Sequence, residues 1–371
     1  MKTEIFRVHS GFDGTKCHVH ARMGITAGGE YVLTAQKLLL AGSDLFDGLE
    51  ETHSTDLLNW TPFRLNPGLV PVPIEEGSKV ELSVCDYSPN LHEATGKLLG
   101  TGAEICYDTT TMPKKKYIPH HKNTAYAVYN EEIGRFDHWK VLEVPDDYFK
   151  NTRAGSTQRY DEADGTILLP VYGDVPEFEK AMISVVFRCS FDGETLKVID
   201  IGNAMVGETD TRGLCEPSVS KFPKNGKYVM SMRSDKSSWF AVSDDGLHYC
   251  EADHWRFDDG EILGQYNTQA HFARLGDKLY LVYTRKGANN DHVFRHRAPL
   301  FIGEIDPKTC RIIRETERAI VPERGARLGN FGVTRVSDNE CIVTAAEWMQ
   351  PVGCEKYGSD NTIYAVRLTA E

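Results

Sequence analysis

The sequence predicts an all-β fold, a six-bladed β-propeller built from four-stranded antiparallel blades. Three observations lead to this prediction. Glycine is abundant, at 32 residues, and aromatic residues make up 10% of the chain, which favours many short strands joined by tight turns. Helical patterns are sparse and are confined to residues 146–151 and 177–182. A short turn motif recurs along the chain.

The recurring turn has the form Ser-x-Asp followed by a large apolar or aromatic residue. It occurs at residues 54–60, 190–196 and 243–249, with looser versions at 130–139 and 305–312. In such a turn the aspartate accepts backbone N–H groups and glycine permits a positive φ. The spacing is on the order of the roughly 40 to 50 residues expected for repeated four-stranded blades, lengthened by insertions.

Strands placed around these turns give six blades. The last blade takes three strands from the C-terminal part of the chain, and its fourth is the N-terminal strand Glu4 to Val8, which closes the ring and removes open sheet edges. We therefore expect one domain over residues 1–371; a division near Pro145 or Gly207 is the structural alternative. The blades are expected at residues 18 to just after 60, 79–144, 153–204, 215–257, 267–317 and 328–368.

Composition excludes several classes of protein. A net charge of −12 argues against nucleic acid as a partner, because phosphates require a basic surface. The N-terminal stretch lacks the apolar core of a signal peptide and no segment has membrane-spanning length, so a cytoplasmic location is expected. The nine cysteines form no CxxC pair, which predicts small buried side chains rather than a disulfide framework or a zinc knuckle.

Polar and titratable side chains gather between residues 264 and 306. Asn267, Gln269 and His271 are two residues apart, so on a strand they project from one face. A turn-rich loop at residues 287–291 follows the next strand, and Arg295, His296 and Arg297 then precede an apolar run. Basic groups beside buried strands are costly unless they meet an anionic partner or ligand. The segment is therefore expected to form one wall of a pocket for a polar ligand.

The recurring turns resemble the Asp boxes of the sialidase superfamily, whose members are six-bladed propellers. The resemblance extends over most of the chain. His20-Ala21-Arg22-Met23-Gly24 stands where that family has its "RIP" motif, and Gly42-Ser43-Asp44 stands at its acidic loop. Cys215-Glu216-Pro217-Ser218 followed by Met232-Arg233 looks like its "EPS … R" pair, and Tyr266-Asn267-Thr268 stands where many sialidases begin the strand with a tyrosine nucleophile.

The resemblance implies a set of roles. Arg22 and Arg233 would clamp a substrate carboxylate, Asp44 would act as acid and base, and Tyr266 would be a nucleophile activated by Glu216. Arg285, Arg295 and Arg297 compete for the place of a third arginine. The chain departs from the "RIP" motif, and it is more similar to bacterial sialidase-like proteins with segments such as NNDHVFRHRAPLF and PERGARLGNFG. Because fold does not determine substrate, this implies a carbohydrate-active hydrolase without naming the sugar.

Histidines offer a rival mechanism. His18 and His20 share one face of the first inner strand, and a ring would bring His271 toward them. A neutral histidine can abstract the proton α to a uronic acid carboxylate, which is lyase chemistry. The same three imidazoles could also hold zinc, but no supporting acid stands beside them in sequence, so no metal and no cofactor are expected.

Other residues are expected at the rim of the site. Glu323, Arg324, Arg327 and Asn330 enter the inner strand of the sixth blade, and Trp348 offers a flat surface for a sugar ring. The sequence thus predicts an exo-acting glycosidase on a polar or acidic terminal sugar. A lyase on uronic acids and a glycan-binding propeller without catalysis are the alternatives. The expected substrate-binding residues are His20, Arg22, Arg233, Asn267, Gln269, Arg285, Arg295, His296 and Arg297.

Overall fold

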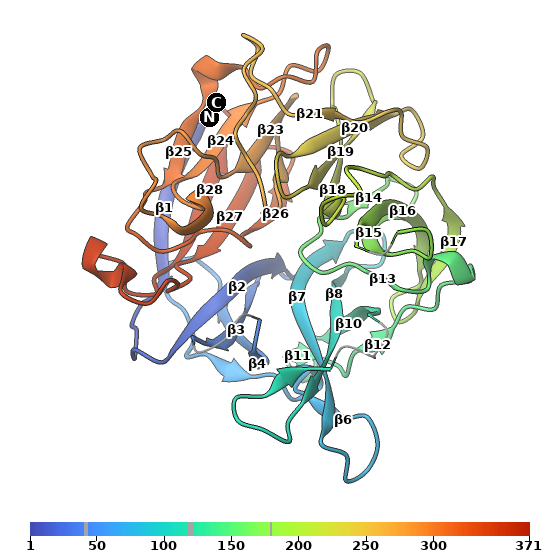
Figure 1. Ribbon diagram of the computed structural model, residues 1–371, viewed down its shortest axis with the longest axis vertical. Coiled ribbons are helices and arrows are strands. Elements are labelled where there is room, and N and C mark those ends of the chain that lie inside the picture. Colours follow the sequence, from blue (N-terminus) through green and yellow to red (C-terminus); the bar gives the residue numbers. More distant parts are fainter. Residues whose placement is uncertain (41–43, 118–121, 179) are drawn as a thin grey trace.

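The strands form sheets that are arranged in a ring around a common centre (Figure 1). The computed structural model describes residues 1–40, 44–117, 122–178 and 180–371. Within these ranges, antiparallel pairing of the strands gives six sheets. The prediction of an all-β propeller is therefore confirmed.

Four of these sheets contain four strands each. They comprise β2 (Lys16–Ile25), β3 (Tyr31–Leu39), β4 (Phe46–Ser54) and β5 (Arg64–Leu65); β18 (Cys215–Lys221), β19 (Tyr228–Arg233), β20 (Trp239–Ser243) and β21 (Asp253–His254); β22 (His271–Leu275), β23 (Lys278–Tyr283), β24 (Leu300–Glu304) and β25 (Arg318–Val321); and β1 (Lys2–His9), β26 (Gly332–Ser337), β27 (Glu340–Ala346) and β28 (Ile363–Thr369).

The other two sheets are larger than the four strands expected for a blade. Short additional strands pair at their margins and give sheets of seven and five strands. The larger contains β6 (Val72–Pro73), β7 (Val80–His92), β8 (Lys97–Asp108), β9 (Lys115–Lys116), β10 (Thr124–Asn130), β11 (Arg135–Phe136) and β12 (Lys140–Val141). The smaller contains β13 (Thr152–Arg153), β14 (Tyr160–Asp161), β15 (Ile167–Asp174), β16 (Met182–Phe191) and β17 (Leu196–Ile201).

The N-terminal strand closes the ring, as the sequence predicts. β1 pairs antiparallel with β28, so that Ile5 lies opposite Val366. The two chain ends lie side by side (Figure 1), and the amino group of Met1 is 3.1 Å from a carboxylate oxygen of Glu371. The inner strands contact one another across the sheets, with β2 touching both β7 and β26.

Apolar side chains hold neighbouring sheets face to face. Val282 and Ile302, from β23 and β24, belong to one buried cluster with Val343 and Val366, from β27 and β28. Each such side chain contributes about 1.5 to 3 kcal/mol when it is removed from water. The packing between sheets fixes where the inner strands meet at the centre.

The recurring turns share one hydrogen-bond pattern. Asp56 accepts the backbone N–H groups of Leu58 and Asn59, each at 2.8 Å. Asp245 accepts those of Leu247 and His248, also at 2.8 Å. Both turns follow the third strand of their sheet, β4 and β20 respectively. The pattern is local and leaves these aspartates without a part in the central site.

Helical structure is limited to short 3-10 turns among the described residues. The expected helix at 177–182 is wrong, because none of its described residues is helical and β16 begins at Met182. The stretch 146–151 holds one of these turns. They are η1 (Pro67–Leu69), η2 (Asp147–Phe149), η3 (Phe294–His296), η4 (Arg314–Thr316) and η5 (Cys354–Tyr357).

Two expectations from composition can be compared with the structure. All nine cysteines are free thiols, and all but Cys250 are buried, which confirms the expectation of small buried side chains. No helix among the described residues is long and apolar enough to cross a membrane.

Candidate active site

Six polar residues, one from each sheet or from a segment next to one of its strands, have left-handed backbones and lie near the centre of the ring. Only a few per cent of residues other than glycine adopt a positive φ, and the conformation costs about 1 to 3 kcal/mol where the surroundings impose it. Three of these residues sit where the pairing of an inner strand with its neighbour shifts register, which marks a β-bulge. The six residues, with φ between 47° and 65°, are His20, Asp86, Ser156, Glu216, Asn267 and Asn330.

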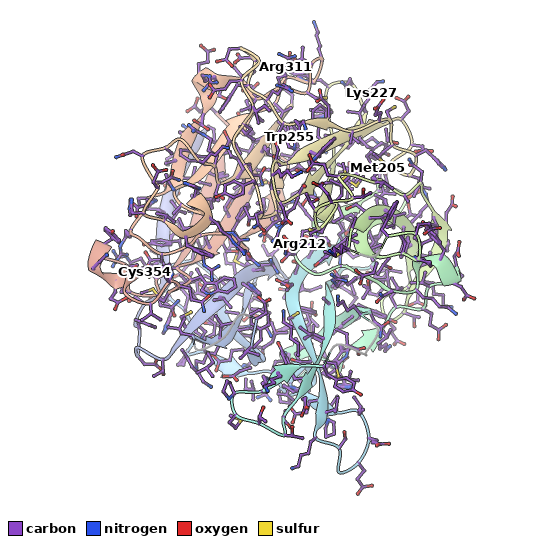
Figure 2. All side chains as sticks on the ribbon, viewed as in Figure 1. Met205, Arg212, Lys227, Trp255, Arg311 and Cys354 are labelled. Atoms are coloured by element: carbon purple, nitrogen blue, oxygen red, sulfur yellow. The ribbon has the colours of Figure 1, made fainter. Side chains whose placement is uncertain are left out.

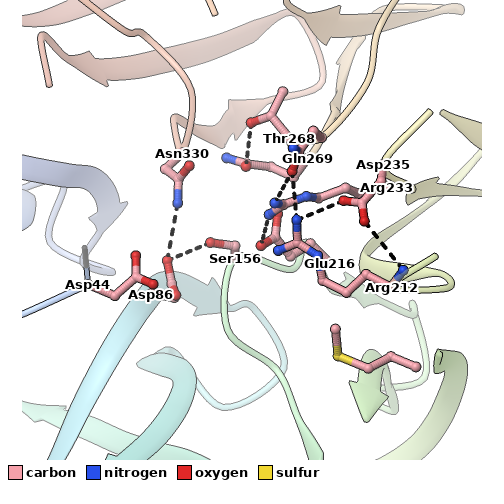
Figure 3. Close-up of polar contacts among 12 residues, drawn as sticks. Asp44, Asp86, Ser156, Arg212, Glu216, Arg233, Asp235, Thr268, Gln269 and Asn330 are labelled. Carbon is pink, nitrogen blue, oxygen red and sulfur yellow. Dashed lines mark hydrogen bonds and ion pairs between the residues drawn. The ribbon is translucent and has the colours of Figure 1, made fainter. Parts of the chain in front are cut away.

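Asp86 is the centre of an acidic half of this site (Figure 3). Its Oδ1 accepts hydrogen bonds from Ser156 Oγ at 2.7 Å and from Asn330 Nδ2 at 3.4 Å. His20 Nδ1 lies 3.2 Å from the same oxygen, and Arg22 Nη1 lies 3.8 Å from it. Burial alone would raise the pKa of Asp86, but His20, Arg22 and the hydrogen bonds lower it to about 2. This carboxylate is therefore ionised at neutral pH.

His20 connects Asp86 to Asn330. Its Nε2 lies 3.0 Å from Asn330 Nδ2, and because an amide nitrogen can only donate, Nε2 accepts and Nδ1 carries the proton toward Asp86. Burial lowers the pKa of His20, so the imidazole is neutral. Arg297 Nη1 donates to Asn330 Oδ1 at 3.3 Å, which fixes the orientation of the same amide.

Guanidinium groups crowd the other half of the site. Arg233 forms an ion pair with Glu216 and donates to Asn267 Oδ1 at 2.5 Å. Arg212, which lies near the centre of the ring (Figure 2), donates to the same oxygen at 2.9 Å and pairs with Asp235 at 2.7 Å. The Glu216 carboxylate raises the pKa of Arg233 above its ordinary value even though burial opposes this.

Arg297 is buried without a carboxylate among the described residues. It is 3% exposed, and besides Asn330 it donates to the backbone oxygen of Asn267. Burial, with the nearby charges of Arg233 and Arg327, lowers the pKa of Arg297 well below its ordinary value. Of the three candidates for a third arginine, Arg297 is the one that contacts both Asn267 and Asn330.

Two further arginines add positive charge beside Arg297. Arg327 is buried, stacks 3.9 Å over the ring of Trp348 and donates to Gln350, and burial together with Arg295 lowers its pKa to about 10. Arg295 forms no ion pair within the described ranges, and burial with the charges of Arg233 and Arg212 lowers its pKa. Such a group of uncompensated cations favours an anionic ligand.

Asp44 lies at the edge of the acidic half. Its side chain is 39% exposed and its Oδ2 is 2.6 Å from Lys116 Nζ, while Tyr107 donates to its backbone oxygen at 2.7 Å. Burial would raise the pKa of Asp44, but the ion pair with Lys116 outweighs this and lowers it. Gly42 and Ser43, the other residues of the acidic motif, lie outside the described residues.

The expected pairing of Tyr266 with Glu216 is not present. The Tyr266 hydroxyl lies 2.7 Å from Nδ1 of His296, whose Nε2 is 3.1 Å from Asp291. Glu216 instead pairs with Arg233. Burial raises the pKa of Tyr266, so its hydroxyl keeps its proton at neutral pH.

His271 lies apart from the residues expected to act with it. It lines a cavity of about 290 Å³ with Arg22 and Gln158, and that lining includes neither His18 nor His20. Ser218 Oγ is 2.7 Å from its Nδ1, and burial lowers the pKa of His271 to about 3. The imidazole is neutral at pH 7, and its role as a base stays a prediction.

The zinc alternative finds no support. His18 lies 2.8 Å from Glu50 and stacks on Phe63 with 4.5 Å between ring centroids, so it does not join His20 and His271. Within the described ranges no group of three or more histidine, cysteine, aspartate or glutamate side chains is arranged to hold a metal ion.

Two expected substrate-binding residues have structural contacts instead. Gln269 is buried and bonds to the segment at Phe331, because β22 begins only at His271 and strand alternation does not reach Asn267. Arg285 pairs with Glu317, with two N–O contacts of 2.7 Å, away from the centre. Arg295 and His296 do not share a strand face, since both have positive φ in a 3-10 turn.

Sequence reasoning missed Asp86 and Ser156. Neither stands in a recognisable motif, since Asp86 falls inside the run SVCDYSPN and Ser156 in RAGSTQ. The one available signal is spacing: the six central residues follow one another at intervals of 51 to 70 positions, close to one per blade.

Comparison with known proteins agrees with this fold. No protein-family model and no curated protein matches the sequence. A protein of unknown function from Dyadobacter fermentans superposes with a TM-score of 0.68 and 14% identity, over 99% of this chain and 98% of that one. Two sialidases also superpose, so the chain has a sialidase-like propeller fold.

The sialidase from Trypanosoma rangeli, in complex with the inhibitor DANA, matches with a TM-score of 0.64 and 14% identity over 98% of this chain. The NanB sialidase of Streptococcus pneumoniae matches with a TM-score of 0.64 and 11% identity, also over 98% of this chain. This chain spans 59% and 70% of those two sialidases, respectively. At such identities the likeness shows the fold alone.

Proposed function

We propose that this protein is an exo-acting glycoside hydrolase and that the terminal sugar of its substrate carries a carboxylate. We further infer that residues 1–371 form one domain and that each of the six sheets is one blade of a six-bladed propeller. The sialidase-like fold supports the class of reaction. The single observation that carries the proposal is the buried guanidinium of Arg297, which has no carboxylate partner among the described residues.

A sugar carboxylate would supply the missing negative charge. A buried ion without a counter-ion is unstable by several kcal/mol, and an arginine presents paired N–H donors that match the two oxygens of a carboxylate. Arg233 and Arg297 both donate to Asn267, and Arg22 reaches the same region through Phe331, to whose backbone oxygen it donates at 3.3 Å. We assign these three arginines to the substrate carboxylate.

We assign to Asp44 the role of the general acid that protonates the leaving oxygen. Glycoside cleavage needs one group to protonate that oxygen and a second to attack or stabilise the anomeric carbon. Asp44 is the most exposed carboxylate of the acidic half and can reach the bond outside the ring. Its low pKa restricts the protonated form to acidic solution, so we expect turnover to rise as the pH falls toward that pKa.

A screen of the purified protein tests the proposal. Oligosaccharides that end in N-acetylneuraminic acid, glucuronic acid or galacturonic acid are compared with neutral ones, and products are read by mass. Hydrolysis adds water to the products, a lyase forms an unsaturated product without it, and a binding protein gives neither. Turnover of neutral sugars alone, or no turnover of any acidic one, contradicts the proposal.

Anion binding gives an independent test on Arg297. The free acids should raise the melting temperature of the wild type, since a ligand that binds only the folded state stabilises it. Arg297→Met should lose this ligand-induced shift, because the cation that attracts the carboxylate is gone. Arg285→Met is the matched control: it removes a partly buried arginine outside the site and should keep the shift even where its own stability falls. Equal shifts in Arg297→Met and wild type would rule out this role.

A further inference from the structure

Asp86 differs from every other carboxylate in the site. Glu216, Asp235 and Asp44 each form a direct ion pair, with Arg233, Arg212 and Lys116 respectively. Asp86 has Arg22 no closer than 3.8 Å; its hydrogen-bond donors are the neutral groups of Ser156 and Asn330, and His20 Nδ1 lies 3.2 Å away. Its negative charge is thus held in place without being cancelled by a cation in contact.

The contacts of Asp86 use only one of its two oxygens. Oδ1 receives the hydrogen bonds of Ser156 and Asn330, whereas Oδ2 contacts only the Cys85 thiol, at 3.8 Å, in the part of the chain that the structure describes. The side chain keeps 19% of its surface exposed. A carboxylate that is oriented through one oxygen, with only a thiol on the other, is suited to attack on a carbon.

The tyrosine in this site is not paired with Glu216; it contacts His296, whose Nε2 lies 3.1 Å from Asp291. Its hydroxyl is hydrogen-bonded to His296 rather than to a carboxylate, and burial keeps its proton in place. Glu216, the expected activator, is engaged with Arg233. In the described residues no tyrosine hydroxyl is hydrogen-bonded to Glu216.

We propose that Asp86 is the catalytic nucleophile of this site, which makes the enzyme a retaining glycosidase with a carboxylate nucleophile instead of a tyrosine. The inference rests on the proposed function. It also explains the network from three sheets: His20, Ser156 and Asn330 fix Oδ1 so that Oδ2 faces the substrate.

The reaction balances in two steps. Asp86 Oδ2 bonds to the anomeric carbon while the glycosidic C–O bond breaks, and its electron pair leaves with the oxygen, which takes the proton of Asp44. A water molecule then attacks the anomeric carbon and gives its proton to the Asp44 carboxylate, and the ester bond to Asp86 breaks. A carboxylate this acidic is a poor proton acceptor, which favours direct attack over activation of water.

Trapping of the covalent intermediate tests the assignment in the unmodified protein. The probe is a fluorinated analogue of the acidic sugar that the screen identifies, with one fluorine beside the anomeric carbon to slow both steps and fluoride as the leaving group. We expect a stoichiometric adduct on the peptide that contains Asp86, and a first-formed product with retained anomeric configuration by proton NMR. An adduct on Tyr266, or inversion of configuration, overturns the assignment.

Substitution separates this inference from the proposed function. Asp86→Asn keeps the size of the side chain and should lower turnover by about a thousandfold or more. The rise in melting temperature that the free sugar acids cause should remain. Asp86→Ala should recover turnover with azide and release a glycosyl azide, which a merely structural role would not produce. Asp277→Asn, an exposed carboxylate outside the site, is the control.

The outcomes are distinct. Wild-type turnover that survives in Asp86→Asn overturns the role of Asp86 alone and leaves the hydrolase in place. Absence of turnover of every acidic sugar by the wild type overturns the proposed function and the role of Asp86 with it.

Discussion

Asp44 and Asp86 show how two carboxylates of one site acquire different chemistry from their contacts. Asp44 pairs with a lysine at the protein surface, whereas Asp86 is held by neutral donors inside the ring. Both have a lowered pKa, but only the partner of Asp44 can be removed without opening the buried network. The Lys116 side chain therefore offers a way to adjust the proposed acid separately from the proposed nucleophile.

Lys116→Met should move the pH dependence of turnover to higher pH. Burial and the charge of Asp86 raise the pKa of Asp44 and Lys116 lowers it, so removal of the lysine should raise that pKa. Because the proposed acid works only below its pKa, the pH at which activity is lost should then rise by about one unit. The check is a pH–kcat/KM profile beside Lys278→Met, a comparably exposed lysine paired with Glu304 elsewhere. Identical profiles for Lys116→Met and wild type would argue against Asp44 as the acid.

The bulged inner strands are the elements that create the site. At the bulges of β2, β7 and β18 the chain inserts residues that break the ladder, and a polar side chain turns to the centre. Regular strands would alternate inward and outward side chains and could not direct His20, Asp86 and Glu216 into one network. The recurring Ser-x-Asp turns have a different role, because they only stabilise the pairing of the strands that they follow.

Asp245→Ala should lower stability without changing the site. The carboxylate accepts two backbone N–H groups and lies at a turn after β20, remote from the central network. Loss of these charge-assisted bonds should cost about 1 to 3 kcal/mol in the free energy of unfolding, as read by urea denaturation. Asp245→Asn, which keeps an acceptor oxygen, should recover part of the loss. A change in the anion-induced melting shift would mean that the turn affects the site after all.

Closure by the N-terminal strand is a property of the whole molecule. β1 supplies the outer edge of the sheet that also holds β26, β27 and β28, so the first and last strands of the chain depend on each other. Without β1, the β28 edge would present unpaired backbone groups to solvent and to other molecules.

Removal of residues 1–9 should therefore destabilise the entire ring and promote association. The expected result is a lower melting temperature and a shift to larger species in size-exclusion chromatography. The matched control is Ile5→Thr, which changes an exposed side chain of β1 but keeps its backbone. A truncated protein that stays monomeric and equally stable would show that closure is unnecessary.

The fold was accessible from the sequence because its signals are local. Ser-x-Asp turns and alternating strands each occupy a few consecutive residues, and together they predicted the strands of the first sheet and the pairing of β1 with β28. The site was accessible only in part. Arg22, Arg233 and Asp44 were named through the family resemblance and Arg297 as one of three competing arginines, and their roles stay predictions, whereas Asp86 depends on a bulge whose left-handed backbone has no sequence pattern. Arg285 and Gln269 were misplaced for the opposite reason, since polar residues near a site were taken for residues in it.

The contribution of one left-handed residue from or beside each sheet also bears on how such a protein can change. His20, Asp86 and Glu216 lie within strands, whereas Ser156, Asn267 and Asn330 lie in segments between strands, so replacing one of these side chains leaves the strand pairing of the ring in place. New ligand preferences can thus arise by exchange of these side chains, without redesign of the ring that carries them.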